Sequence, residues 1–256
     1  MGIRRFLLSL AILAWLCSSA FSAEQGEKPL KVCLVSGSLE YKSNESLAGF
    51  QKYLEQHYNV ACTRAFIEGE REDHLPGLEN LDDCDVMLLF TRRLQLSGDE
   101  LERIKKYCLS GKPIVGVRTA SHAIQTWLEL DKEVLGGNYQ GHYGNDELPE
   151  LEITEAGRDH ATLKGVEPWK SSGSLYKNTP LAEDVTVLMT GRLPDGRTEP
   201  ITWTRDYKGG RIFYTALGHT DDFAEESFRR MLASALFWVC RREPNQTASA
   251  IEQGSK

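Results

Sequence analysis

The stretch GKPIVGVRTASHAIQTW, residues 111–127, decides the predicted fold. Its apolar run, Pro113 to Val117, is typical of a short buried strand, and a polar turn, residues 118–121, separates it from a helix-like stretch through His122 and Trp127. In α/β enzymes a strand that breaks into a helix at such a turn often carries the nucleophile. Here the turn presents Arg118, whose guanidinium donates hydrogen bonds but does not attack. The pattern predicts an α/β fold and raises the question of what this turn does.

Strand and helix patterns alternate before this stretch. A helix is expected over Ser43 to His57, and a second begins after Ser97, with Ser97 and Glu100 forming a capping box. The strands expected around these helices are Leu30 to Val35, Asn59 to Phe66 and Asp85 to Phe90. Because these strands are continuous apolar runs, both of their faces should be covered. We therefore predict a flavodoxin-like, doubly wound and mainly parallel sheet in a three-layer α/β/α domain.

The last third of the chain has a different pattern. Its strands are joined by loops rich in Gly and Pro and should extend the sheet in mixed or antiparallel fashion; they are Leu151 to Thr154, Val185 to Met189, Ile201 to Thr204 and Arg211 to Thr215. Asp221 and Asp222 are expected to open a final helix, since acidic residues favour a helix N-terminus. One domain over 30–240 and a disordered polar tail over 243–256 complete the prediction.

The N-terminus predicts where the protein is located. Arg4 and Arg5 precede an apolar run from Phe6 to Leu16 and then small residues, as in a secretory signal peptide over 1–22. We expect a periplasmic or extracellular protein without a membrane anchor after cleavage, exported by either the Sec or the twin-arginine route; an uncleaved anchor is the alternative. Cleavage removes two arginines and no acidic residue, so the formal net charge of −7 becomes −9. Such an acidic chain disfavours nucleic acid as a partner.

Five cysteines remain after residue 22, namely Cys33, Cys62, Cys84, Cys108 and Cys240. Their number is odd and no CxxC motif is present, which argues against a disulfide framework or a zinc knuckle. We interpret them as small buried hydrophobic residues, with one disulfide as the alternative in an oxidising compartment.

Polar residues follow the predicted strands, and ligands of open parallel sheets bind beyond the carboxyl ends of the strands. These segments predict a single site there, and its candidate residues are Glu40 after the first strand, Arg92 after the third, Arg118, Ser121 and His122 after the fourth, His219, Asp221 and Asp222 after the strand that ends at Thr215, and Tyr139, His142, Tyr143 and Tyr176 from the intervening loops. The loop 136–143 is rich in glycine and aromatic residues, a composition that suits closure over a ligand.

Each candidate also has a structural interpretation. Arg92 and Arg118 could pair with acids such as Glu40 or Asp222, and the two aspartates could serve only the helix N-terminus. His122 could be a cap or packing residue, and Tyr139 and Tyr143 could be core aromatics. His219 follows a glycine at a strand end and has a carboxylate two residues later, which favours a catalytic role.

Four segments together resemble the ThuA-like (trehalose utilisation) family over roughly residues 30–240. They are GKPIVGVRTASHA, LGGNYQGHYG, EPITWTRDYKGGRIFYTALGH and FRRMLASALFWVC. The resemblance implies the fold of class I glutamine amidotransferases, in which a Gly-x-Cys turn carries the nucleophile. Gly116-Val117-Arg118 stands in that position, and His219-Thr220-Asp221 resembles the His-x-Glu pair. Without a thiolate there is no acyl-enzyme, so glutaminase activity is not expected.

The chain also departs from the family pattern. Many ThuA-like proteins resemble Gly-x-His at the turn and have a histidine in the first loop, whereas this chain has Arg118 and Glu40-Tyr41-Lys42. We therefore predict no metal or other cofactor; zinc held by His142, His219 and either His122 or Asp222 is the alternative. A guanidinium in place of an imidazole favours an anionic or polyhydroxyl ligand.

The leading hypothesis is an exported enzyme, of hydrolase or lyase type, that acts on a carbohydrate or sugar derivative. His219 would be the general acid/base, oriented by Asp221 or Asp222, while Arg118 and Arg92 would position oxygens and Glu40 would supply a second carboxylate. The remaining candidates would line the pocket of a small sugar-like ligand. A non-catalytic sugar- or metabolite-binding module and a scaffold protein are the alternatives; the sequence predicts no oligomeric state.

Overall fold

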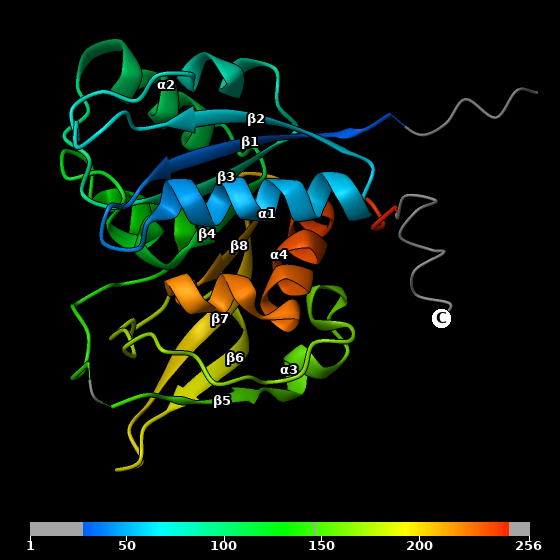
Figure 1. Cartoon of the computed structure of the whole chain (residues 1–256). Helices are drawn as coiled ribbons and strands as arrows, with labels where there is room; N and C mark the ends of the chain where they lie inside the picture. Colours follow the sequence, from blue (N-terminus) through cyan, green and yellow to red (C-terminus); the bar gives the residue numbers. More distant parts are fainter. Residues whose placement is uncertain (1–27, 146, 246–256) are drawn as a thin grey trace, which may run out of the picture.

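The computed structural model of the chain describes residues 28–145 and 147–245 (Figure 1). The predicted signal peptide over 1–22 lies outside these residues, and so does the part of the predicted tail from 246 to 256. Among the helices of the described ranges, none is long and apolar enough to cross a membrane.

One mixed sheet organises the described residues. Its eight strands follow the order β2-β1-β3-β4-β8-β7-β6-β5. The first five in this order are parallel and the last three join by antiparallel pairing. Their bounds are Leu30–Gly37 (β1), Val60–Phe66 (β2), Val86–Thr91 (β3), Ile114–Val117 (β4), Glu150–Ile153 (β5), Thr186–Arg192 (β6), Thr198–Tyr207 (β7) and Gly210–Thr215 (β8). The predicted parallel core and antiparallel extension are both present.

The helices pack against this sheet. They are α1 (Ser43–His57), α2 (Gly98–Leu109), the single turn α3 (Glu155–Arg158) and α4 (Glu226–Val239). Helix α1 contacts β1 and β2, α4 contacts β4 and β8, and the two helices touch each other on one face (Figure 1). Every residue of β3 and β4 is buried, as expected for strands covered on both faces.

Three local expectations were wrong. Ser97 precedes α2 but makes no side-chain capping bond, and the carboxylate of Glu100 is hydrogen-bonded to His74 and to the backbone N–H of Leu75, so no capping box forms. Asp221 and Asp222 belong to a separate 3₁₀ turn, Thr220–Ala224, and α4 begins after it at Glu226. The helix-like stretch after β4 is likewise only a 3₁₀ turn, Arg118–His122. Helix α2 still begins directly after Ser97, whereas the other two patterns form only single 3₁₀ turns.

The cysteines match their structural interpretation in the described residues. All five are free; Cys33 and Cys108 are buried and the other three are partly buried. Their environment is that of small hydrophobic residues rather than of a disulfide framework.

The backbone after α2 packs closely against the start of β8, and this contact requires glycine at position 210. A Cβ atom added at Gly210 would overlap the carbonyl of Gly111, a backbone group that cannot move aside easily. We expect Gly210→Ala to lower the free energy of unfolding by about 1–3 kcal/mol. Gly49→Ala on α1, where no atom lies within 4 Å of the added methyl group, should be neutral or stabilising. Denaturant unfolding measures both, and equal stability of the two variants would contradict this packing.

Candidate functional site

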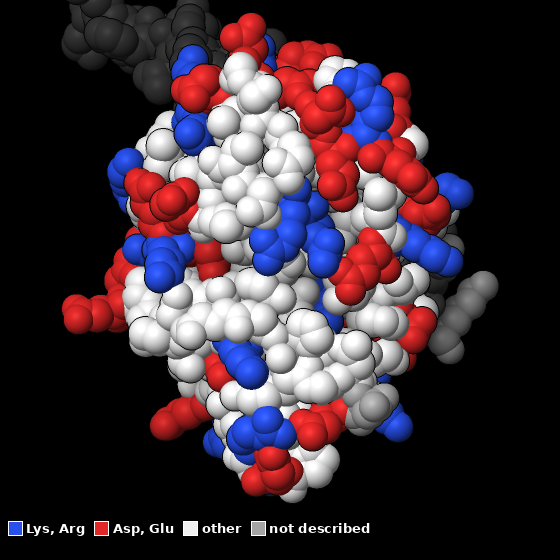
Figure 2. All heavy atoms as spheres, turned by 90° about the vertical axis from the view of Figure 1, so that its left-hand side faces the viewer, with Lys and Arg blue, Asp and Glu red and all other residues white. Residues whose placement is uncertain are grey.

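The carboxyl ends of the parallel strands meet at one edge of the sheet, the left-hand side of Figure 1. The loops that follow them are bonded to one another: Arg93 donates its backbone N–H to His122 O at 2.8 Å, and Thr220 donates its hydroxyl to Tyr41 O at 3.3 Å. Figure 2 shows this edge facing the viewer, with basic side chains near its centre and acidic ones beside them. The predicted convergence of the loops is therefore present.

Backbone strain accumulates at the same edge. Lys42, Arg93 and Arg118, in the loops after β1, β3 and β4, have φ values of 46°, 49° and 45°. Left-handed backbone costs a non-glycine residue roughly 1–2 kcal/mol, and such residues cluster at functional sites. Gly218, after β8, also has a positive φ, of 122°. Three of these four loops thus contain a non-glycine residue in the left-handed region, and the fourth places a glycine where positive φ carries no steric penalty.

Arg118 lies beneath this edge rather than on it. Its residue exposure is 1%, and its guanidinium carbon lies 4.7 Å from the ring centroid of Tyr41 and 4.5 Å from that of Tyr176. Nη1 donates to Ala216 O at 2.7 Å and Nη2 lies 3.4 Å from both oxygens of Ser174. Asp222 is not bonded to it, which excludes the simple Arg118–Asp222 ion pair that was one interpretation. The guanidinium is a buried cation covered by aromatic rings.

His219 is the candidate acid or base that reaches the surface. One third of its side chain, 33%, is exposed, and its ring meets the edge of Tyr41 with centroids 5.9 Å apart. Nδ1 is buried without a hydrogen-bond partner and lies 3.7 Å from Asp221 Oδ2. Tyr41 therefore contacts both Arg118 and His219, so the two predicted residues share one location.

Asp222 holds the backbone of this turn. Its Oδ2 accepts hydrogen bonds from Gly218 N, His219 N and Ser171 Oγ, at 2.8, 2.9 and 3.1 Å. Oδ1 accepts one from Trp169 Nε1 at 2.9 Å, and the residue is 1% exposed. Its carboxylate is engaged with these four donors and makes no hydrogen bond to the imidazole, so Asp222 fixes the backbone of His219 and not its ring.

His122 is held as a neutral imidazole. Its ring stacks on Tyr139 with centroids 4.2 Å apart, and Nδ1 lies 3.0 Å from Ser121 Oγ. Burial, and then the positive charges of Arg93, Arg92 and Arg118, lower the pKa of His122 to about 3. Tyr176 borders the same cluster, at 4.7 Å from Tyr139 and 6.5 Å from the exposed His142. These aromatic residues lie together as predicted, with His122 in a packed position.

Of the remaining predicted residues, Arg92 and Glu40 form an ion pair with each other, and Tyr143 lies away from the carboxyl edge of the sheet. Arg92 Nε contacts Glu40 Oε2 at 2.8 Å, with both side chains about half exposed, so the pairing interpretation is confirmed for Arg92. Tyr143 belongs to a separate cluster beside β7, where its hydroxyl donates to Glu199 at 3.2 Å and its ring is covered by Arg197 and Lys177. Its predicted place in the pocket was wrong, because the loop turns its side chain toward the antiparallel strands.

Sequence reasoning missed Asp131. This carboxyl group is 3% exposed in a π-helical turn, Asp131–Leu135. Oδ2 accepts a hydrogen bond from Tyr139 N at 2.7 Å while Oδ1 is buried without a partner. Burial raises the pKa of Asp131 to about 7. The glycine pair 136–137 was the available sign, because a Cβ at Gly137 would collide with this carboxylate.

No group of three or more His, Cys, Asp and Glu side chains within residues 28–145 and 147–245 is arranged to hold a metal ion. The zinc alternative, with His142, His219 and either His122 or Asp222, therefore has no set of ligands brought together in this part of the chain.

The fold and this edge define an α/β protein of the type in which loops beyond a parallel sheet form the site. The family model described as trehalose utilisation, ThuA, matches residues 31–239. The chain belongs to the ThuA family, as the sequence motifs predicted.

Comparison with solved structures agrees with this fold. A protein described as ThuA-like from Parabacteroides merdae has a TM-score of 0.65 and 19% identity over 86% of this chain and 93% of its own. Another from Bacteroides uniformis has a TM-score of 0.61 and 18% identity over 86% and 95%. A cold-adapted β-galactosidase from Rahnella sp. R3 matches over 85% of this chain and 32% of its own, with a TM-score of 0.54 and 14% identity. No curated protein sequence matches the chain.

The four donors around Asp222 yield a stability prediction. Asp222→Asn would place an amide N–H₂ against groups that are themselves donors, and should lower the free energy of unfolding by about 1–3 kcal/mol. Asp221→Asn changes a side chain that is 73% exposed and should have little effect. Thermal or denaturant unfolding compares the two variants, and a harmless Asp222→Asn would show that these hydrogen bonds do not hold the turn.

The raised pKa of Asp131 predicts a pH-dependent difference in stability. Between its ordinary value near 4 and about 7, the folded chain keeps a proton on Asp131 that the unfolded chain releases, so stability falls as pH rises. Asp131→Asn removes the carboxyl group and with it this pH-dependent contribution to the free energy of unfolding. The variant should gain stability over wild type progressively from pH 4 to 7, with a constant difference above that range. Unfolding midpoints at several pH values measure it; a difference independent of pH would contradict the burial of this carboxyl group.

Proposed function

We propose that the chain is an enzyme that acts on a carbohydrate or sugar derivative by acid/base chemistry, without a cysteine nucleophile. The family description, trehalose utilisation, supports a sugar-related role. The observation that carries the proposal is the environment of His219. Its imidazole is one-third exposed, its Nδ1 has no hydrogen-bond partner, and a carboxylate lies 3.7 Å away. An apo site often has such a long contact, which shortens when substrate binds.

In this proposal each residue has a distinct role. His219 exchanges the proton and Asp221 orients its imidazole, while the carboxylate of Asp222 fixes the backbone that carries the ring. The exposed Arg92–Glu40 pair offers a guanidinium and a carboxylate to sugar hydroxyls. Tyr139 and His142 supply faces for a sugar ring. Arg118 acts from beneath, as a fixed positive charge under Tyr41 that stabilises negative charge without touching the substrate.

The strand order β2-β1-β3-β4 supports the finer assignment of a flavodoxin-like, three-layer fold related to class I glutamine amidotransferases. In that relation Arg118 occupies the nucleophile turn, and its left-handed backbone is what a strained elbow requires. The position therefore keeps the geometry of the elbow but not its chemistry, and glutamine hydrolysis is not part of the proposal.

Localisation, ligand and cofactor remain part of the same proposal. We propose export by an N-terminal signal peptide over 1–22, a small sugar-like ligand, and chemistry that needs no metal or other cofactor. Nucleic acid and membrane are not proposed as partners. The scaffold alternative gains little support, because Leu39 and Leu128 are the large apolar side chains exposed in the described residues.

A second candidate function is sugar binding without chemistry. Two observations favour it. The carboxylate of Asp222 is occupied by backbone and side-chain donors, and His122 is a neutral, packed ring, so neither is free to take part in catalysis. His219 would then act with Asp221 as its nearby carboxylate. This candidate predicts that a sugar raises the melting temperature of the protein while no product accumulates.

The test is turnover of ordinary and oxidised disaccharides by the purified protein. If one of them is converted, His219→Ala should reduce kcat by about 10²–10⁴-fold, the usual contribution of a general acid or base. Tyr143→Phe, in the separate cluster beside β7, is the matched control and should retain activity. Full activity of His219→Ala would refute the catalytic assignment, whereas thermal stabilisation without product would support the binding module.

A further inference from the structure

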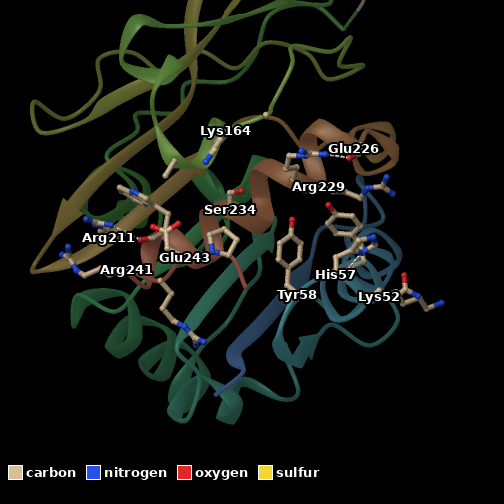
Figure 3. Close-up of a pocket in the computed structure, with 18 of the residues that line it drawn as sticks. Lys52, His57, Tyr58, Lys164, Arg211, Glu226, Arg229, Ser234, Arg241 and Glu243 are labelled. Carbon is tan, nitrogen blue, oxygen red and sulfur yellow. Dashed lines mark hydrogen bonds and ion pairs between the residues drawn. The ribbon is translucent and has the colours of Figure 1, made fainter. Parts of the chain in front are cut away.

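A second region of the molecule has the composition of a binding site. A groove with a volume of about 1350 Å³ lies between α1, α4 and the 161–165 segment (Figure 3). Of the chain's 30 Lys and Arg residues, seven line this groove, against two of its 37 Asp and Glu residues. The groove therefore has an excess of basic residues, whereas the chain as a whole has an excess of acidic ones and a net charge of −7. It is the composition of a surface that attracts anions.

Several of these cations lack an acidic partner. Within the described residues, Lys52, Lys164, Arg211 and Arg229 take part in no ion pair, whereas Arg230 is paired with Glu226. Arg229 Nε is buried without a hydrogen-bond partner, and its guanidinium lies 5.0 Å from the ring centroid of Tyr53. Unmatched charges at such a density repel one another, and an anionic ligand would relieve this repulsion.

The donors are spread along the groove instead of converging on one point. Figure 3 shows Ser234 and Tyr58 in the middle, Lys164 above them, Arg211 on one side and Arg229 with Lys52 on the other. A single phosphate would engage only part of this array. A volume above the roughly 300–1,000 Å³ of small-molecule pockets also suits an extended ligand.

We propose that this groove binds an acidic oligosaccharide, whose carboxylates pair with the lysines and arginines and whose hydroxyls bond Ser234 and Tyr58. The choice of a sugar chain over other polyanions rests on the proposed carbohydrate function of the protein. The ring of Tyr53, half-buried beside Arg229, offers an apolar surface of the kind that sugar faces contact. The groove is a separate binding site, since none of the residues assigned to the carboxyl edge of the sheet lines it.

Calorimetric binding of a galacturonate hexasaccharide to the whole protein tests the proposal. Wild type should bind it, with an affinity that falls as salt concentration rises, and should not bind a neutral glucose hexasaccharide. Lys164→Glu and Lys52→Glu, both exposed, should each weaken binding by about tenfold, because each replaces an attraction by a repulsion. Lys106→Glu, an exposed change of equal charge on α2, should bind like wild type.

Three results would overturn the proposal: no binding of the acidic oligosaccharide, equal loss in Lys106→Glu and the groove variants, or tighter binding of a single-stranded DNA of equal charge. Arg229→Gln gives a further check, since it removes a guanidinium without reversing charge and should weaken binding less than Lys164→Glu. The acidic oligosaccharide should bind His219→Ala as it binds wild type. Failure of the catalytic proposal, measured by turnover, is therefore distinguishable from failure of the groove.

Discussion

The guanidinium of Arg118, enclosed between the rings of Tyr41 and Tyr176, joins four separate parts of the chain. The rings come from the loop after β1 and from the 173–176 segment, and the carbonyl that accepts from Nη1 belongs to Ala216 after β8. The backbone carbonyl of Arg118 in turn accepts a hydrogen bond from Tyr214 on β8 at 2.7 Å. Burying a cation without a bonded carboxylate is costly, and the two ring faces offset this cost together with the oxygens of Ala216 and Ser174 that accept from the guanidinium.

This arrangement determines what the edge of the sheet can do. Because Arg118 is buried beneath Tyr41, its positive charge lies under the edge and its guanidinium is not exposed to a ligand. Contact with a ligand would therefore come from the exposed residues around it. Burial, together with the positive charges of Arg93, Arg92 and Arg118, lowers the pKa of His122 to about 3 and so keeps its imidazole neutral. His219 has a side chain that is one-third exposed, and a carboxylate oxygen of Asp221 lies 3.7 Å from its Nδ1. In the proposed function, the turn after β4 supplies a fixed positive charge in place of a nucleophile.

The two proposed sites differ in the kind of recognition they offer. The carboxyl edge combines aromatic faces, an imidazole and one exposed ion pair, which suits a small polyhydroxyl ligand. The groove between α1 and α4 offers dispersed cations and suits a longer anionic one. Because the chain as a whole is negatively charged, with a formal net charge of −7, the positive groove would also guide such a ligand to one location.

The sequence by itself determined the strands of the sheet and the edge at which the candidate residues gather. Continuous apolar runs identified the parallel strands to within a few residues, and the rule that ligands lie beyond their carboxyl ends brought Arg118, His219 and Arg92 to one edge. These inferences succeed because hydrophobic pattern and strand polarity are local properties. Only the tertiary structure decided that Arg118 is enclosed, that Tyr143 turns away and that Asp131 is buried behind the loop. It also decided that Lys52, Lys164, Arg211 and Arg229, far apart in the sequence, line one groove. The direction of a side chain, and which charged residues from distant parts of the sequence lie near one another, depend on how the helices and strands pack. The periodicity of the sequence does not contain this information.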